Sequence, residues 1–168
     1  QCASQGTCAA PIPVTLALGT IALNASTSGS DTMQSSICGD STGPELVFAV
    51  TPMTAGFLTA WTDPVTTNFD AIVYARTQCV GNNDIQCGDN NPQEPDLVSF
   101  QVGDGMQPVY IVVDGYQMDA GDFTLHLDLS TGDSCSDPVP ILVGDQNGLT
   151  EHALGSTTGK TDDAVGSC

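Results

Sequence analysis

The stretch from residue 46 to residue 129 consists of short apolar segments separated by turn-forming residues, and this spacing restricts the chain to folds built from strands. In its last segment Phe123, Leu125, Leu127 and Leu129 alternate with polar residues. Period-two alternation predicts a strand with one buried and one solvated face. Many short strands at such spacing indicate an all-β sandwich or barrel. We expect strands at residues 46–50, 57–61, 71–75, 97–102, 109–113 and 123–129.

The charge balance limits the possible partners. The chain has 20 acidic residues and two basic ones, Arg76 and Lys160, and its formal net charge is −18. Nucleic acid is therefore excluded as a partner, because phosphate binding needs a cationic face. Divalent cations would relieve the repulsion among so many carboxylates. The alternative is that the acidity only keeps an exposed protein in solution. No apolar run approaches the roughly 20 residues that a membrane span needs.

Seven cysteines in a chain of 168 residues are typical of a secreted protein that folds in an oxidising compartment. No Cys-x-x-Cys pair occurs, and His126 and His152 are far in sequence from any cysteine cluster, so a zinc site is not expected.

The motif C-x-x-P-[IV]-P-[IV] occurs twice, at residues 8–14 and 135–141. Each copy is followed by a stretch rich in Ser, Thr and Gly that ends in a cysteine, Cys38 and Cys168. The repeat predicts an N-terminal arm at 1–7, a β-sandwich at 8–133 and a partial second repeat at 134–168.

An incomplete repeat cannot bury its own apolar side chains, which here are Val139, Ile141, Val143 and Leu149. Two explanations stay open. The chain is a piece of a longer tandem array, or the segment 134–168 docks on a neighbouring copy by strand addition and so joins subunits into a fibre.

The repeat also suggests a disulfide pattern. It pairs Cys8 with Cys38 and Cys135 with Cys168, and leaves Cys79 to pair with Cys87 across a short turn. Each bond would stabilise the fold by roughly 2–4 kcal/mol. Cys2 is then left over, either free or bonded between molecules. Sequence alone leaves the connectivity open.

Four motifs, taken in order, resemble the bacterial pre-peptidase C-terminal (PPC) domains. They are D-x-x-V-Y-x-R-x-x-C at 70–79, Cys-Gly-Asp-Asn at 87–90, Y-I-x-V-D-G-Y at 110–116 and G-x-F-T-L at 121–125. The resemblance implies a jelly-roll antiparallel β-sandwich that serves as a non-catalytic module of secreted bacterial proteins, sometimes in tandem, with calcium at acidic loops in collagen-binding relatives. No peptidase is attached here and the chain ends inside a second repeat, which favours a protein of the bacterial cell surface or a fibre.

Acidic residues gather in the predicted turns and suggest a calcium site. Calcium prefers clustered oxygen ligands in flexible loops. The alternative is that these are ordinary turn residues bonded to their own backbone. The candidate ligands are Asp70, Asp84, Asp89, Asn90, Glu94, Asp96, Asp114, Asp119 and Asp122.

Two further side-chain groups suggest contacts. Arg76 lies in an apolar strand, where an unpaired charge is costly, so we expect an ion pair with Asp70 or Asp114. The aromatic residues could instead form a sugar-binding platform, although the core needs most of them. These are Trp61, Tyr74, Tyr110 and Tyr116.

No catalytic motif is recognisable. His126 lies in an alternating strand, and neither a G-x-S-x-G elbow nor an H-E-x-x-H motif occurs. We therefore expect no enzyme but an extracellular structural protein, a self-assembling fibre or surface-layer subunit stabilised by disulfides and calcium. The alternative is a non-catalytic module of a secreted hydrolase or adhesin that binds a polysaccharide (glycan) or protein ligand.

Overall fold

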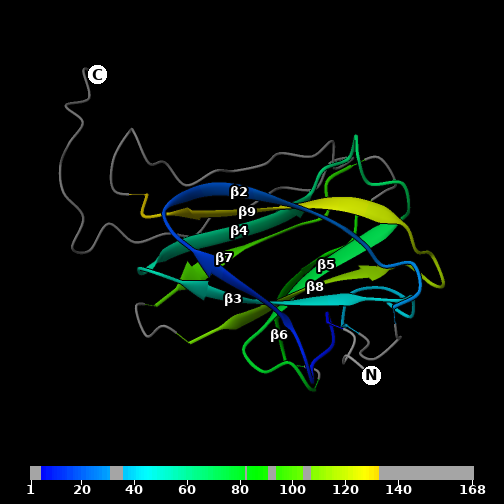
Figure 1. Ribbon diagram of the computed structural model, residues 1–168, viewed down its shortest axis with the longest axis horizontal. Coiled ribbons are helices and arrows are strands. Elements are labelled where there is room, and N and C mark those ends of the chain that lie inside the picture. The colour runs from blue at the N-terminus through cyan, green and yellow to red at the C-terminus, as the bar shows by residue number, and fades with distance from the viewer. Residues whose placement is uncertain (1–4, 31–35, 82, 91–93, 104–106, 133–168) are drawn as a thin grey trace.

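The computed structural model describes residues 5–30, 36–81, 83–90, 94–103 and 107–132, and these form two β-sheets packed face to face (Figure 1). The prediction of an all-β sandwich is confirmed. No helix that could cross a membrane occurs in this described part of the chain. The predictions for Cys2, Cys135, Cys168 and the segment 134–168 lie outside the described residues. The strands are β1 (Ile12–Leu16), β2 (Gly19–Ser26), β3 (Leu46–Pro52), β4 (Gly56–Thr62), β5 (Ala71–Arg76), β6 (Asp84–Gly88), β7 (Leu97–Val102), β8 (Val109–Gly115) and β9 (Asp122–Ser130).

The strand order is that of a jelly roll. One sheet has the order β1-β3-β8-β5-β6 and the other β2-β9-β4-β7. The antiparallel pairs are nested: β5 pairs with β6, β4 with β7, β3 with β8 and β2 with β9. A long hairpin with its tip between β5 and β6 has thus been rolled into two layers.

One pair departs from the predicted antiparallel arrangement. Strand β1 lies parallel to β3, with Ile12 opposite Phe48 and Leu16 opposite Pro52. The chain reverses direction between β1 and β2 and again between β2 and β3. Because β2 belongs to the other sheet, β1 and β3 meet pointing the same way.

The inner faces of the two sheets form the main core. The predicted alternation of β9 is confirmed, since Phe123, Leu125, Leu127 and Leu129 are all buried between the sheets. The ring of Phe123 meets that of Phe48 edge to face at 6.3 Å between centroids. All six predicted strands form, while β1, β2 and β6 were not predicted.

A second buried layer covers the outer face of the five-stranded sheet. Its apolar centre consists of Val47, Ile72, Tyr74 and Val112. Strand β5 is therefore buried on both faces along its whole length. The predicted N-terminal arm is bonded to β3, because the Gly6 carbonyl accepts a hydrogen bond of 2.9 Å from the Val47 amide.

Two disulfides fasten this layer, and they contradict the predicted pairing. Cys8 bonds to Cys79 and Cys38 bonds to Cys87, with Cα separations of 5.5 and 5.8 Å. The hairpin places the two cysteines differently: Cys87 lies in β6 opposite Tyr74, whereas Cys79 lies in the loop that follows β5. The two bonds agree with an oxidising compartment outside the cytosol.

Candidate functional site

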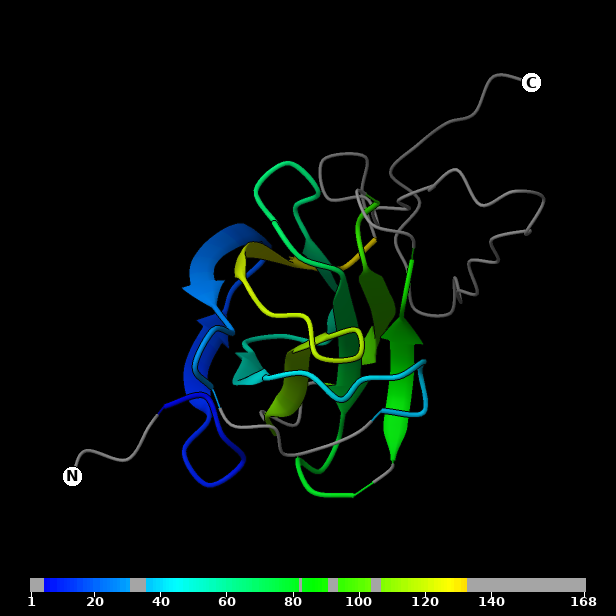
Figure 2. The same cartoon turned by 90° about the vertical axis from the view of Figure 1, so that its right-hand side faces the viewer.

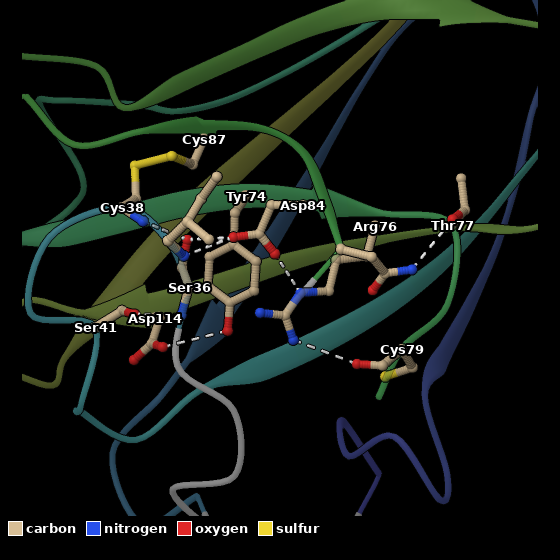
Figure 3. Close-up of polar contacts among 12 residues, drawn as sticks. Ser36, Cys38, Ser41, Tyr74, Arg76, Thr77, Cys79, Asp84, Cys87 and Asp114 are labelled. Carbon is tan, nitrogen blue, oxygen red and sulfur yellow. Dashed lines mark hydrogen bonds and ion pairs between the residues drawn. A yellow bond between two sulfur atoms is a disulfide. The ribbon is translucent and has the colours of Figure 1, made fainter. Parts of the chain in front are cut away.

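A buried acid cluster lies in the outer layer, and Figure 3 shows its contact between Tyr74 and Asp114. The Tyr74 hydroxyl is 3.2 Å from Glu45 Oε2 and 3.3 Å from Asp114 Oδ2, and all three side chains are buried. Burial raises the pKa of Asp114 to about 7, and the Glu45 carboxyl adds to the rise. Burial also raises the pKa of Tyr74, as do the charges of Glu45 and Asp114. At neutral pH Asp114 is therefore partly protonated, whereas an aspartate in water would be ionised.

Arg76 pairs with Asp84, not with Asp70 or Asp114 as the sequence suggested. Its Nε lies 2.5 Å from Asp84 Oδ1, and both side chains are fully buried. Its guanidinium also lies over the Tyr74 ring, 4.6 Å from the centroid, and its Nη1 donates to the Cys79 carbonyl at 3.4 Å. The predicted ion pair therefore exists, but its partner comes from β6, the strand that the sequence did not reveal.

Asp84 connects β6 to the segment that follows Ser36. Its Oδ2 accepts hydrogen bonds from the Ser36 hydroxyl at 2.7 Å and the Ile37 amide at 2.8 Å (Figure 3). With Arg76 on its other oxygen, this carboxylate has its hydrogen-bonding capacity largely used. Asp84 and Asp114 therefore belong to the covered layer and are not grouped with the other predicted metal ligands.

Four of the other predicted aspartates meet with Asp40 at one end of the five-stranded sheet, which we call the acidic end. The four are Asp70, Asp89, Asp96 and Asp119. Asp70 immediately precedes β5, Asp89 immediately follows β6, and Asp96 immediately precedes β7. Asp119 lies in the β8–β9 loop, and its Oδ2 is 3.4 Å from the Asp70 amide.

Asp40 completes the acidic end and was not among the predicted ligands. Figure 2 shows the cyan segment that carries it running beside the yellow β8–β9 loop, where the Asp40 carbonyl accepts a 2.6 Å hydrogen bond from the Gln117 amide. Gly39 has a φ of +53°, and a Cβ there would overlap the Asp89 carboxylate. The Cys38–Cys87 disulfide joins the Cys-Gly-Asp segments at 38–40 and 87–89, and so brings these two aspartates near one another.

The carboxylates of the acidic end repel each other. Burial raises the pKa of Asp70, and the charges of Asp89 and Asp119 raise it further. Burial raises the pKa of Asp89 too, with Asp40 contributing. Burial raises the pKa of Asp96 to about 8; a hydrogen bond from the Asn90 amide opposes the rise, and Asp89 and Asp70 add to it. The acidic end therefore favours binding of a proton or another cation.

Three predicted ligands are not among these five aspartates. Asp122 is exposed at the start of β9, in the other sheet. Asn90 makes two hydrogen bonds within its own loop. Its backbone amide donates to Asp96 Oδ1 at 2.8 Å, and its side-chain amide donates to the Pro95 carbonyl at 2.7 Å. Glu94 has a buried Oε2 without a hydrogen-bond partner among the described residues. For Asn90 the turn-residue interpretation thus holds.

The donor chemistry of the acidic end fits calcium. All its side-chain donors are oxygens, and Asp70 Oδ1 is buried with no hydrogen-bond partner among the described residues. Within the same residues, no three acidic, imidazole or thiol groups are arranged to hold a metal ion by themselves. A calcium ion would therefore need backbone carbonyls or water to complete its roughly six to eight ligands.

The four aromatic residues do not form a common platform. Tyr74 is fully buried in the five-stranded sheet, and Trp61 lies in β4 of the other sheet. Trp61 stacks instead on His126, with 4.9 Å between ring centroids. His126 Nε2 is 3.5 Å from Asp63 Oδ2, and both side chains are partly exposed.

Comparison with known proteins finds remote structural likenesses. No protein-family model matches the chain, and no curated protein matches it either. One similar solved structure is the pre-peptidase C-terminal domain of a collagenase from Bacillus anthracis, with 13% identity, a TM-score of 0.46, and coverage of 70% of this chain and 94% of that one. Another is a periplasmic inhibitor of g-type lysozyme from Aeromonas hydrophila, with 10% identity, a TM-score of 0.45, and coverage of 71% and 99%. The first belongs to the family that the sequence motifs resemble; at this distance neither likeness assigns a ligand or an activity.

Proposed function

We propose that this chain is a non-catalytic extracellular structural module that binds calcium at its acidic end and associates with other copies through residues 134–168. The observation that supports calcium binding is the meeting of five aspartates from four loops, with Asp89 and Asp96 both in the β6–β7 loop. Among them Asp70 has a buried Oδ1 without a described partner. Asp70 and Asp89 would hold the ion, with Asp40, Asp96 and Asp119 close by. Bound calcium would replace repulsion between carboxylates by attraction to a shared cation.

Thermal unfolding with added calcium, with added magnesium and with a chelator tests this proposal. Because a ligand that binds only the folded state stabilises it, calcium at about 100 times its Kd should add about 2.7 kcal/mol to the free energy of unfolding. Magnesium should add less, because it loses its water reluctantly and demands octahedral geometry.

A double variant, Asp70→Asn with Asp89→Asn, separates calcium binding from general charge effects. It should unfold at a higher temperature than the wild type in chelator, because repulsion is relieved, and should lose the response to calcium. The matched control is Asp122→Asn, an exposed aspartate in the other sheet, which should keep the full response. An equal calcium response in the double variant and the control would exclude the site.

Self-association is supported by the structure that the first copy of the repeated motif adopts. Residues 12–14 of that copy form the start of β1, a strand that reaches the core only by lying against another strand. The second copy, at 135–141, carries the same apolar positions. We therefore propose that it too is completed by pairing with a strand, supplied by a neighbouring copy in a fibre or surface layer.

Negative-stain electron microscopy of the full chain, beside a version that ends at Ser134, tests assembly. Regular fibres from the full chain alone would support the proposal, and their loss on chelation would connect calcium to the subunit or the joint. If every sample contains only compact particles, self-association is wrong. A persistent monomer that binds a glycan or a protein saturably would then favour the second candidate, a binding module of a larger secreted protein.

A further inference from the structure

Strand β1 shows the structure that the repeated motif adopts when it pairs with β3. Its burial alternates: Val14 and Leu16 are buried in the core, while Pro13 and Thr15 are exposed. Val14 lies opposite Val50 and Leu16 opposite Pro52 of β3. In the C-terminal copy Ile141 corresponds to Val14 and Val143 to Leu16, so both buried positions are apolar again. Leu142 takes the place of the exposed Thr15.

The prolines of the motif restrict where such a strand can pair. Proline has no N–H, so Pro13 can be tolerated in β1 only if that position faces away from β3. The free edge of β1 is therefore a poor site for adding another strand. The C-terminal copy has Pro140 at the equivalent position and needs the same kind of neighbour, an edge like that of β3.

The disulfides give a second, independent correspondence. In the described fold Cys8 pairs with Cys79 and Cys38 pairs with Cys87, so the two cysteines of the first repeat segment do not bond to each other. Cys135 and Cys168 are their sequence equivalents. By this equivalence Cys135 should bond to a cysteine in the position of Cys79, and Cys168 to one in the position of Cys87. This argues against the Cys135–Cys168 bond that the repeat first suggested.

We propose that residues 135–143 take, on a second copy of this chain, the place of residues 8–16 against β3, with Cys135 bonded to that copy's Cys79. This inference rests on the proposed self-association and names the acceptor surface for it. Ile141 and Val143 then fill the core positions of Val14 and Leu16. The incoming segment buries two apolar side chains and the outgoing segment exposes two, so the exchange changes the buried apolar area little.

The bond change is a thiol–disulfide exchange and needs no outside oxidant. The Cys135 thiolate attacks the Cys79 sulfur, the Cys79–Cys135 bond forms as the Cys8–Cys79 bond breaks, and Cys8 leaves as a thiolate that takes up a proton. The number of disulfides is unchanged. Cys79 is buried in the fold, so β1 must loosen before the attack can occur.

Mass spectrometry of mixed copies tests the exchange. Isotope-labelled and unlabelled full chains are mixed with a trace of thiol, alkylated and digested without reduction by a protease that cleaves after acidic residues, since the chain has only two basic ones. We expect a peptide in which Cys135 of one label is bonded to Cys79 of the other. Bonding of Cys135 only to Cys168, or only to Cys79 of its own copy, would overturn the proposal.

Two neighbouring substitutions provide the matched pair. Ile141→Asp places a charge where the buried Val14 lies and should reduce the cross-linked peptide at least tenfold. Leu142→Asp corresponds to the exposed Thr15 and should leave the yield within twofold of the wild type. Equal yields from the two variants would contradict seating against β3. If fibres form without the cross-link, self-association stands and this acceptor is wrong; if neither appears, both are wrong.

Discussion

The two faces of the five-stranded sheet are both buried, but by different kinds of contact. The inner side packs apolar residues against the facing sheet, in one core cluster that includes Val73, Ile111 and Leu127. The outer side buries a tyrosine, an arginine and three acids under loops that two disulfides hold in place. Apolar burial tolerates imprecise contacts, whereas buried charge requires each partner to be in position. The outer layer should therefore be the more fragile of the two.

The largest loss of stability is expected from breaking the buried ion pair of the outer layer. Arg76→Met leaves Asp84 buried without its cation and should cost about 3–5 kcal/mol in the free energy of unfolding, measured with urea. Replacing both partners, as Arg76→Met with Asp84→Leu, should recover most of this loss, because no uncompensated charge remains. A double variant as unstable as the single one would show that the Ser36 and Ile37 contacts of Asp84 dominate.

Removing one disulfide should loosen the outer layer alone. Cys38→Ser with Cys87→Ser should cost about 2–4 kcal/mol through the entropy of the unfolded chain. Hydrogen exchange should accelerate in β6 and in the segment 36–45 at denaturant concentrations where the amides of β9 remain protected. Uniform acceleration in both layers would mean that they unfold as one unit.

The buried acids make stability depend on pH in the outer layer. The pKa of Asp114 is about 7 in the folded chain and near 4 in the unfolded one, so the folded state binds the extra proton. Its contribution is complete below pH 4 and is lost as the pH rises through 7. Asp114→Asn should remove that loss. At pH 9 its free energy of unfolding should exceed that of the wild type by on the order of 2 kcal/mol, measured with urea at pH 4 and at pH 9. The same slope in both proteins would place the titration at another group, for which Asp96 is the first candidate.

The smallest effect is expected on the outer side of the other sheet. His126→Ala removes the stacking on Trp61 and the contact with Asp63, and should cost about 0.5–1.5 kcal/mol, because these side chains are partly exposed. His126→Phe, which keeps the stacking, should recover most of the loss in the same urea measurement. Full loss in the phenylalanine variant would assign the effect to Asp63.

The inner layer was predictable because its pattern is local. The alternation at 123–129 and the apolar runs at 46–50 and 109–113 report burial directly. Strand β2 carries the same signal, with Ile21, Leu23 and Ala25 turned toward the core, and could have been found. In β1 the prolines conceal the alternation of Val14 and Leu16.

The outer layer was not predictable in the same way, because its contacts depend on register. Strand β6 is short and largely polar, so hydrophobicity does not reveal it, yet its pairing sets the partners of both Arg76 and Cys38. Charge clustering did identify four of the five aspartates of the acidic end. It could not distinguish them from Asp84, Asp114 and Asp122, which the fold places in the outer layer and in the other sheet.

The nested pairing of the jelly roll has a consequence for how the chain acquires its structure. The β5–β6 hairpin joins neighbouring segments and can form early, whereas β2 and β9 are about a hundred residues apart, as the pair Asn24 and Thr124 shows. Contacts between such distant segments slow folding, because a long loop must close before they stabilise anything. During synthesis β2 has no partner until β9 leaves the ribosome, so the sandwich can close only after nearly all of residues 5–130 have been made.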